Sequence, residues 1–262
     1  MKKVWLMGGF GNVLFQILAF NVLSEKNGTV FFVKKLTEKN IFTKVLKWKI
    51  HQRLYNDLID EKHFIKVTDV KTFFILICCF FSKLFKLKLK TAFFYNHKTQ
   101  LNEFSSNNVF GYFQNKVFLS KNQKHIRELG QLLRSNYSFD KKFPIVVHYR
   151  KGDSNWALEF AEYYHTVREM LKNEVLPIIV VTDSISNAED FFKEITNLKI
   201  LSSKNALDDF KYLVSCNKLF CAPSTFSWWA AHSLLNKTEV IVPEFFMSNL
   251  GMYSESRINV IK

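Results

Sequence analysis

Four short segments carry residue types that could bind or transfer a charged group, and each follows an apolar stretch typical of a strand. The segments are 8–12, 148–153, 183–184 and 224–227. In a sheet of parallel strands, ligands bind beyond the carboxyl ends of the strands. These four segments are therefore the first candidates for a functional site.

The first segment reads Gly8-Gly9-Phe10-Gly11-Asn12. Glycines between a strand and a helix let a ligand approach the backbone closely, and they leave helix N–H groups available to an anion. The spacing does not match G-x-G-x-x-G, so the pattern does not indicate a nicotinamide dinucleotide site. A tight turn without a ligand is the alternative interpretation.

The second segment, 148–153, reads HYRKGD. An arginine at a strand end has the planar fork that binds a phosphate through two hydrogen bonds. Gly152 permits a turn there, and Asp153 could orient Arg150 or accept a proton. The alternative is an ion pair on the surface at the end of a strand.

The last two segments both stand where helices are expected to begin. Residues 224–227 read STFS, and hydroxyl groups at a helix start together with unpaired backbone N–H groups make a seat for phosphate. The alternative is an N-cap followed by two core tryptophans, Trp228 and Trp229. Asp183 follows another apolar stretch, and carboxylates are common helix N-caps, so a structural role is the more frequent one for it.

The elements that position these segments can be read from the periodicity. The first 33 residues indicate a strand at 3–7, a helix at 12–25 and a strand at 29–33. Farther along, strands at 144–149, 177–182, 218–222 and 239–242 alternate with helices near 159–173, 186–195, 208–215 and 226–235. This alternation predicts an α/β fold with parallel sheets covered on both faces. A polar turn at 139–142 predicts two domains, 1–140 and 141–262, and residues 34–140 receive no firm assignment.

Composition excludes several classes of protein. The chain has 262 residues with 28 Phe, 8 Gly and 4 Pro, which excludes disordered and collagen-like proteins. The 37 Lys and Arg against 23 Asp and Glu give a net charge of +14, which raises a nucleic-acid-binding protein as a distant alternative. No motif of that class is present, and the phenylalanines lie in runs typical of a core, so we expect no nucleic-acid partner.

Cysteine usage and the N-terminus predict a cytoplasmic protein. The 4 cysteines include the adjacent pair Cys78 and Cys79, and their spacing fits neither a disulfide scaffold nor a structural zinc site. The glycine-rich segment 8–12 interrupts the apolar N-terminus, which therefore does not match a signal peptide.

The most apolar stretch, 73–81, reads FFILICCFF and is too short to span a bilayer, which takes about 20 residues. It continues into 82–90, where lysines alternate with apolar residues. One interpretation is a buried helix followed by a solvated one. The other is a peripheral contact with anionic lipid headgroups on the inner face of the membrane.

Taken together and in order along the chain, the motifs resemble those of the α-1,2-fucosyltransferase family. The most specific matches are the His-x-Arg-x-Gly-Asp pattern and the Ser-Thr-Phe-Ser-Trp-Trp-Ala-Ala block. The matching stretches are Gly8–Asn12 with Phe15 and Gln16, Gly111–Gln114, His148–Asp153, Tyr163-Tyr164, Asp209 with Ser215-Cys216, and Ser224–Ala231.

The resemblance implies a fold of two Rossmann-like domains facing a cleft, the glycosyltransferase type B arrangement. It implies transfer of L-fucose from GDP-fucose to a galactose hydroxyl, with inversion at the anomeric carbon. The acceptor would be a galactose-terminated, lipid-linked oligosaccharide of a bacterial, O-antigen-like glycan. A related donor such as GDP-colitose, which lacks one hydroxyl of fucose, is the alternative within the same fold.

The resemblance also implies roles for individual residues. Arg150 would bind the β-phosphate, and His148 with Asp209 would contact the guanosine. The diphosphate would be lined by Ser224, Thr225, Phe226 and Ser227, and the fucose and acceptor would face Gly9, Gly11 and Asn12. The chain departs from the family pattern at several positions: Lys151 replaces a second arginine, Pro223 and Thr225 replace Asn and Ser, and Asp183-Ser184 replaces a more acidic pair.

Charge on the leaving diphosphate has to be stabilised during such a transfer. The sequence contains no Asp-x-Asp pair of the kind that holds a divalent ion in metal-dependent glycosyltransferases, so no metal cofactor is expected. Arg150, the helix start at 224–227 and nearby lysines would act instead. Asp153 is the first candidate for the base that deprotonates the acceptor and Asp183 the second, and Asn12 joins Arg150 and Asp153 as a candidate for the chemical step.

Overall fold

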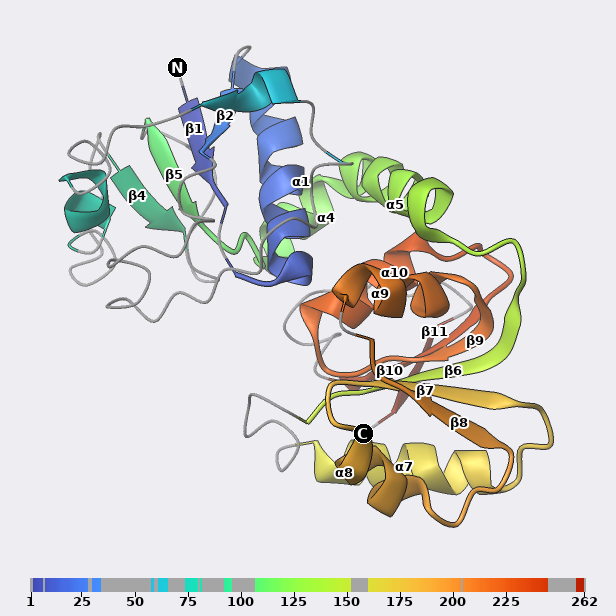
Figure 1. The fold of residues 1–262 in the computed structure, drawn as a ribbon. Helices are drawn as coiled ribbons and strands as arrows, with labels where there is room; N and C mark the ends of the chain where they lie inside the picture. Colours follow the sequence, from blue (N-terminus) through green and yellow to red (C-terminus); the bar gives the residue numbers. More distant parts are fainter. Residues whose placement is uncertain are drawn as a thin grey trace. The chain divides into compact units, whose positions relative to one another are not determined.

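The computed structural model describes residues 2–6, 8–27, 30–33, 58, 61–65, 74–79, 81, 92–95, 107–151, 160–203, 205–244 and 258–261. The chain forms two compact units, Met1–His125 and Ile126–Lys262 (Figure 1). Each unit contains a parallel sheet with helices packed on it, which confirms the predicted α/β class with two Rossmann-like parts. Their arrangement across a cleft stays a prediction.

The described strands of the first unit form a five-stranded parallel sheet in the order β3-β2-β1-β5-β4. The strands are β1 (Lys2–Trp5), β2 (Val30–Val33), β3 (Phe64–Ile65), β4 (Ala92–Tyr95) and β5 (Asn108–Gly111). The helical elements include α1 (Phe10–Asn27), the short 3-10 helix η2 (Glu61–His63) and α4 (Lys116–Lys121), and residues 74–79 and 81 are also helical. Because β2 and β5 flank β1 on opposite sides, the strand order reverses beside β1, and such a switch point is where open parallel sheets bind ligands.

The core of the first unit lies between β1, β5 and α1. Trp5 is fully buried, its ring stacks on Phe110 at 4.9 Å, and its Nε1 donates a hydrogen bond to Asn108 Oδ1. Helix α1 is apolar nearly all round, which explains why most of its side chains are buried. The helix therefore holds its N-terminal segment firmly at the end of β1.

The second unit has a six-stranded parallel sheet in the order β11-β10-β9-β6-β7-β8 among the residues described. The strands are β6 (Phe143–Tyr149), β7 (Ile178–Thr182), β8 (Leu198–Leu201), β9 (Cys216–Phe220), β10 (Glu239–Pro243) and β11 (Ile258–Ile261). The helices are α7 (Ala161–Lys172), α8 (Ile185–Phe192), α9 (Ala206–Val214) and α10 (Thr225–Ser233). In this sheet the switch point lies between β6 and β9.

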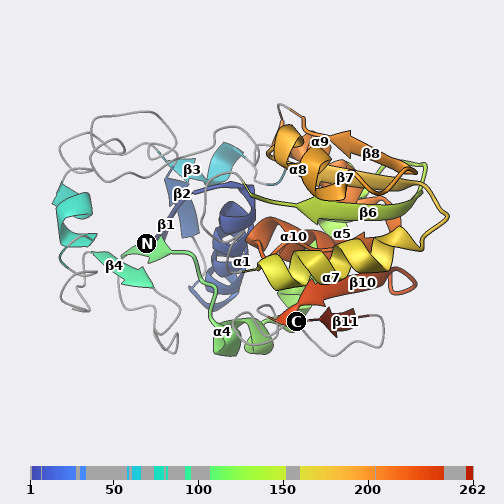
Figure 2. The same ribbon diagram turned by 90° about the horizontal axis from the view of Figure 1, so that it is seen from below.

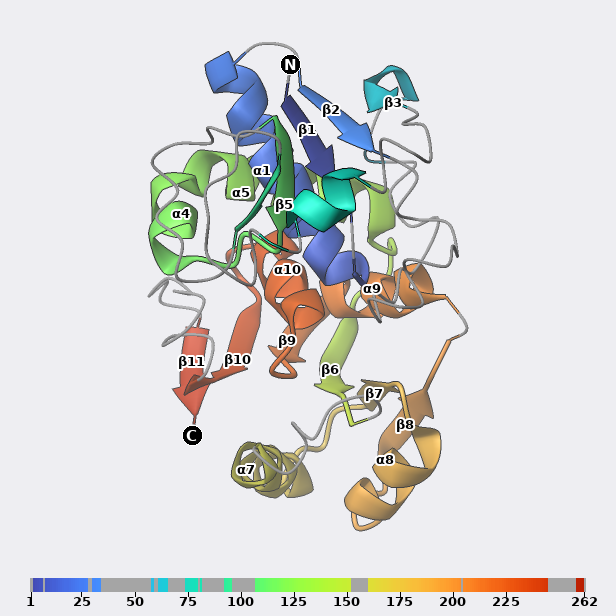
Figure 3. The same cartoon turned by 90° about the vertical axis from the view of Figure 1, so that its left-hand side faces the viewer.

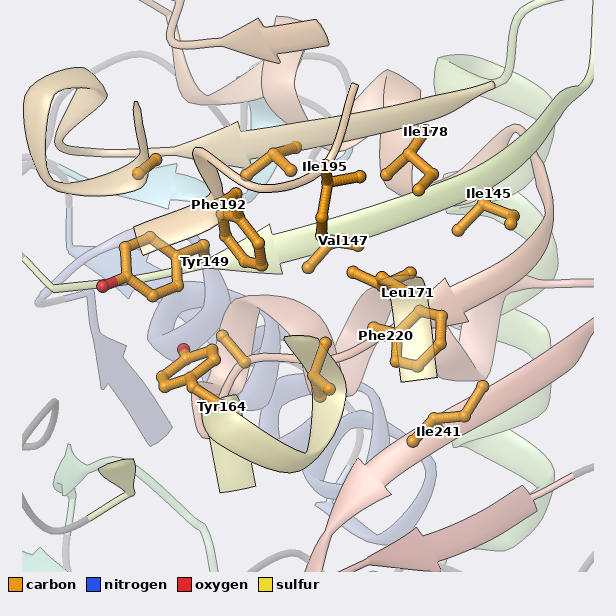
Figure 4. Close-up of a cluster of buried hydrophobic side chains, with 14 of the residues drawn as sticks. Ile145, Val147, Tyr149, Tyr164, Leu171, Ile178, Phe192, Ile195, Phe220 and Ile241 are labelled. Carbon is orange, nitrogen blue, oxygen red and sulfur yellow. The ribbon is translucent and has the colours of Figure 1, made fainter. Parts of the chain in front are cut away.

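Helices cover both faces of the second sheet, with α7 and α8 on one face and α9 and α10 on the other (Figures 1 and 2). Alternation along β6 directs Ile145, Val147 and Tyr149 into the apolar cluster shared with α7 and α8 (Figure 4). The intervening His148 lies on the opposite side of the strand and reaches α10 instead. The fully buried cluster thus fixes which way the histidine points.

Helix α5 (Gln123–Tyr137) packs against α10, and this contact decides where the two units divide. A Cβ atom on Gly130 would lie 2.4 Å from the backbone oxygen of His232, so the two helices approach at the backbone. Arg134 Nη1 also donates to Ser233 O at 3.4 Å. The contacts therefore divide the chain at 125/126, within α5, and not at the predicted 140/141, because most of α5 belongs to the second unit.

The helices and strands predicted beyond residue 140 are confirmed, with small changes at their ends. Strand β9 begins at Cys216, two positions before the predicted 218. The periodicity did not identify β8 or β11, and it left β3, β4, β5, α4 and α5 unassigned. Within the part of the chain that the structure describes, no helix combines the length and apolarity needed to cross a membrane.

Gly130→Ala is expected to destabilise the protein, although alanine normally stabilises a helix interior by about 1 kcal/mol relative to glycine. The new methyl group would meet the His232 carbonyl, and overpacking of this kind costs about 1–3 kcal/mol or more. Urea denaturation of Gly130→Ala, with the exposed α5 variant Ser135→Ala as a control, measures the difference. A Gly130→Ala protein as stable as the wild type would contradict the close packing of α5 on α10.

Candidate functional site

The contact between β6 and α10 is made by His148 and Ser227. The Nδ1 atom of His148 lies 2.5 Å from Ser227 Oγ, and both side chains are buried. Ser227 Oγ also accepts a hydrogen bond from Ala222 N at 3.0 Å. Because a hydroxyl group has one hydrogen, this pattern is best satisfied when Ser227 donates to Nδ1 and the ring carries its proton on Nε2.

The electrostatic surroundings keep His148 neutral. Burial, together with the smaller effect of the nearby positive charge of Arg150, lowers the pKa of His148 to about 3. The ring packs against Phe226, 5.5 Å away between centroids, and Phe226 in turn packs against Phe210 of α9 at 5.2 Å. A neutral imidazole held this firmly can serve as a hydrogen-bond donor at a fixed position.

The N-terminus of α10 is capped by a serine, as the sequence indicated. Ser224 is the N-cap residue, and its side chain accepts a hydrogen bond from Ser227 N at 3.3 Å. Thr225 begins the helix and is half-buried, whereas Trp228 and Trp229 are fully buried in the core. The N-cap and the core tryptophans are therefore confirmed, and they leave the helix start at the switch point between β6 and β9.

The tips of β6 and β7 are joined through Asp183. Its Oδ2 lies 3.8 Å from Arg150 Nε, and its Oδ1 accepts a hydrogen bond from Lys151 N at 3.0 Å. Tyr164 OH accepts a hydrogen bond from Arg150 N at 3.2 Å. Arg150 and Asp183 both keep more than a third of their side chains exposed, so their ion pair is weak and exchangeable.

Asp209 occupies the first turns of α9 and faces the loop after β8. Its Oδ1 accepts hydrogen bonds from Ser203 N at 3.1 Å and Ser203 Oγ at 2.5 Å. Burial raises the pKa of Asp209, the nearby charges of Asp208 and Asp183 add to this, and the bonds from Ser203 oppose it. Asp183 follows β7 and Ser203 follows β8, so Asp209 contacts the loop at the carboxyl end of the strand beside β7.

In the first unit, hydrogen bonds from two glutamine side chains lie at the switch point between β1 and β5. Gln114 Nε2 donates to Asn12 Oδ1 at 2.8 Å, and Gln16 Nε2 donates to Gly111 O at 3.1 Å. Gly9 begins the α1 turn, since its carbonyl accepts from Asn12 N at 2.9 Å and Val13 N at 3.0 Å. Segment 8–12 thus forms the predicted turn into a helix.

Gly8 is required by both its conformation and its surroundings. Its φ is +84°, a value that residues with a side chain rarely adopt. A Cβ atom there would lie 2.8 Å from Asn12 Nδ2 and 3.3 Å from the ring of Tyr112. The Asn12 amide group therefore lies directly over the Gly8 backbone, and the close approach of a ligand to this segment stays a prediction.

In the second unit, the structure joins the sequence-predicted residues in smaller groups. His148 contacts Phe226 and Ser227, Asp183 contacts Arg150 and Lys151, and Asp209 contacts Ser203. In the first unit, the sequence-predicted residues are Gly9, Gly11 and Asn12. Asp153, the first candidate base, lies outside the described residues.

Two functional contacts were missed by the sequence reasoning. Gln114 was noted only as part of a motif, yet it holds the Asn12 amide. Tyr164 was noted only as half of a tyrosine pair, yet it binds the backbone at Arg150. Both residues lie in stretches that match the family pattern, so the motifs mark them, although the motifs do not indicate these contacts.

His148 is expected to make the protein less stable in acid. Between pH 6.5 and about 3 the unfolded chain takes up a proton at this ring and the folded chain does not. The free energy of unfolding therefore falls with decreasing pH, by about 1.4 kcal/mol per pH unit from this group.

Urea denaturation of the wild type and of His148→Gln between pH 6 and pH 4 tests this, with slope differences of about that size expected. His165→Gln, which removes an exposed histidine of α7, controls for the loss of an imidazole. Identical slopes in the wild type and His148→Gln would show that the buried ring is protonated in the folded protein.

Gly8→Ala is expected to destabilise the first unit by about 2 kcal/mol or more, from backbone strain and from the clash with Asn12. In an Asn12→Ala background the clash with Nδ2 disappears, so the same change should cost about 1 kcal/mol less. A double-mutant cycle on unfolding free energies measures this coupling. Strict additivity would mean that Asn12 does not lie over Gly8.

Comparison with solved structures places the fold among known glycosyltransferase structures. The E. coli heptosyltransferase WaaC with ADP superimposes with a TM-score of 0.53 at 10% identity, over 99% of this chain and 92% of that chain. Weaker similarities include the glycosyl transferase family 9 protein from Veillonella parvula, with a TM-score of 0.47 at 12% identity over 99% of this chain and 86% of that one. They also include the α-1,6-fucosyltransferase NodZ soaked with GDP-fucose, with a TM-score of 0.38 at 15% identity over 89% and 92%.

No protein-family model matches the chain, and no curated protein matches it. The similarity to WaaC is therefore a similarity of fold. It shows that this chain has the α/β architecture with parallel sheets that WaaC has.

Proposed function

We propose that this protein is a glycosyltransferase that takes a nucleoside-diphosphate sugar, and specifically that it moves L-fucose from GDP-fucose to the 2-hydroxyl of a terminal galactose. The observation that carries the proposal is the contact of the serine-capped start of α10 with His148 at the switch point of the second sheet. Arg150 comes directly after β6, the strand that carries His148. The fold similarity to a heptosyltransferase and the family motifs in the sequence support the same class of reaction.

The diphosphate of the donor would bind between the tip of β6 and the start of α10. The N–H groups of the first turn of α10 carry a partial positive charge, and hydroxyl groups of Ser224 and Thr225 stand beside them. Arg150 can exchange its weak contact with Asp183 for two hydrogen bonds to phosphate. Lys151 would add a positive charge without fixing the geometry.

The guanosine would be recognised by His148 and Asp209. With Nδ1 satisfied by Ser227, the His148 Nε2–H group is a neutral donor at a fixed position. The described contacts of Asp209 both go to Oδ1, so Oδ2 is suited to accept N–H groups of guanine. His148 and Asp209 would discriminate strongly between nucleobases, because a base that cannot hydrogen-bond to them leaves a buried polar group unpaired.

The chemical step would depend on stabilising the leaving GDP. As the bond to the sugar lengthens, negative charge grows on the β-phosphate, and donors that are already in position lower the barrier. Arg150 and the start of α10 supply those donors in our proposal, without a metal ion. The amide pair of Asn12 and Gln114 in the first unit offers hydrogen bonds suited to sugar hydroxyls.

The acceptor hydroxyl would lose its proton to a carboxylate. Asp153 remains our first candidate for this base. Asp183 stays the second candidate: its Oδ1 accepts a hydrogen bond from Lys151 N, and its Oδ2 would be released when Arg150 turns to the phosphate. Asp153→Asn should abolish turnover at saturating donor while GDP still binds, and unchanged activity would remove Asp153 from the mechanism.

Arg150→Ala should lower turnover of GDP-fucose by about 100-fold or more, the scale of losing one key donor to a developing anion. Arg127→Ala, at an exposed position of α5, serves as the matched control. The assay uses GDP-fucose with a panel of β-galactosides, with and without a chelator, followed by linkage analysis of the product. Near-normal turnover by Arg150→Ala would refute its assignment.

Donor choice is tested in the same assay. We expect GDP to inhibit more strongly than ADP, because His148 and Asp209 are suited to guanine. We also expect faster turnover of GDP-fucose than of GDP-colitose. Tighter binding of ADP would contradict the guanosine assignment, and a preference for GDP-colitose would leave the reaction class intact but change the sugar.

A further inference from the structure

A helical segment of the first unit is apolar on two opposite faces. Residues 74–79 and 81 are helical (teal in Figure 1), and Figure 3 shows this helix on the face of the sheet opposite α1. Ile75, Leu76 and Cys79 are buried. The opposite face of the helix is therefore turned away from the core.

That outer face carries large apolar side chains where a helix on a protein surface normally carries polar ones. Phe74, Ile77 and Phe81 are 60%, 36% and 46% exposed, and their spacing of three and four residues places them on one stripe. We call these three residues the apolar stripe. Isolated exposed apolar residues are common, but a contiguous stripe marks a surface that binds something.

The charge of the surrounding sequence identifies the occupant. From 71 to 102 the sequence has six lysines, at 71, 83, 86, 88, 90 and 98, and no Asp or Glu. Lysine is depleted at protein–protein interfaces, whereas helices that lie on membranes combine apolar side chains with many lysines. In the sequence, Lys83 follows Phe81 by two residues.

We infer that the apolar stripe and the lysines that follow it attach this protein to an anionic lipid surface. Phe74, Ile77 and Phe81 insert among the headgroups and upper acyl chains, and the lysines bind lipid phosphates. In the structure, one apolar face of this helix lies outside the core. The attachment does not depend on which sugar or nucleotide the protein uses.

Vesicle sedimentation with the full chain tests the inference. Vesicles of phosphatidylcholine alone are compared with vesicles of phosphatidylcholine and phosphatidylglycerol in equal amounts. We expect binding at least about tenfold stronger to the anionic vesicles, and weaker binding as salt is raised. Equal binding to both kinds of vesicle would overturn the inference.

The variant Phe74→Ser/Ile77→Ser/Phe81→Ser should reduce binding to anionic vesicles by at least about tenfold. The control is Val175→Ser/Leu176→Ser, which removes two apolar side chains of the second unit that are 89% and 50% exposed. Circular dichroism and GDP binding verify that both variants fold. Unchanged vesicle binding by the stripe variant overturns the inference, and so does light scattering that shows the stripe joining two copies of the chain without lipid.

A native thiol gives a measurement that requires no change to the stripe. Cys78 lies on the same helix and is partly exposed, whereas Cys79, Cys216 and Cys221 are buried. A polarity-sensitive fluorophore on Cys78 should shift to shorter wavelength with anionic vesicles and not with neutral ones. The absence of a shift, in protein that sediments with the vesicles, would show that another surface binds the lipid.

Discussion

The hydroxyl group of Ser227 holds the second unit's candidate site together. It accepts a hydrogen bond from Ala222 just beyond β9 and contacts the ring of His148 at the end of β6. These two strands are neighbours in the sheet, and the order of strands reverses between them. A single buried side chain therefore connects the ends of two strands with the start of a helix. It does so at the switch point, where a parallel sheet offers backbone groups to a ligand.

The first unit also has a switch point in its sheet, but different polar groups lie beside it. Its strand order also reverses, between β1 and β5, and amide groups of Asn12 and Gln114 meet there. Charged and hydroxyl groups gather in the second unit, and amides gather in the first. In the reaction that we propose, the second unit would bind the anionic donor and the first unit a neutral sugar.

Some strands could be predicted from the sequence and others could not, depending on their composition and their place in the sheet. Strands β6 and β7 lie inside the sheet and are mostly apolar, so their runs of valine and isoleucine predict buried strands. Strand β8, with the sequence LKIL, is an edge strand that carries a lysine, and β11 is an edge strand of only four residues. The boundary at 140/141 was misplaced because a polar turn says nothing about which neighbour a preceding helix packs against.

The sequence predicts which residues belong to the candidate site better than it predicts which of them contact each other. A hydroxyl-rich helix start and an arginine after a strand are visible in the sequence. That Ser227 contacts His148, 79 residues away, follows only from the reversed strand order. The role of Gln114 could not be derived either, because no local pattern shows that β5 lies beside β1.

The position of the Asn12 amide over Gly8 has a consequence for any substitution of the glycine. A side chain at residue 8 would force the Asn12 amide to move away. Because that amide also accepts the hydrogen bond from Gln114, a substitution at residue 8 would be felt at residue 114, on a different element of the first unit.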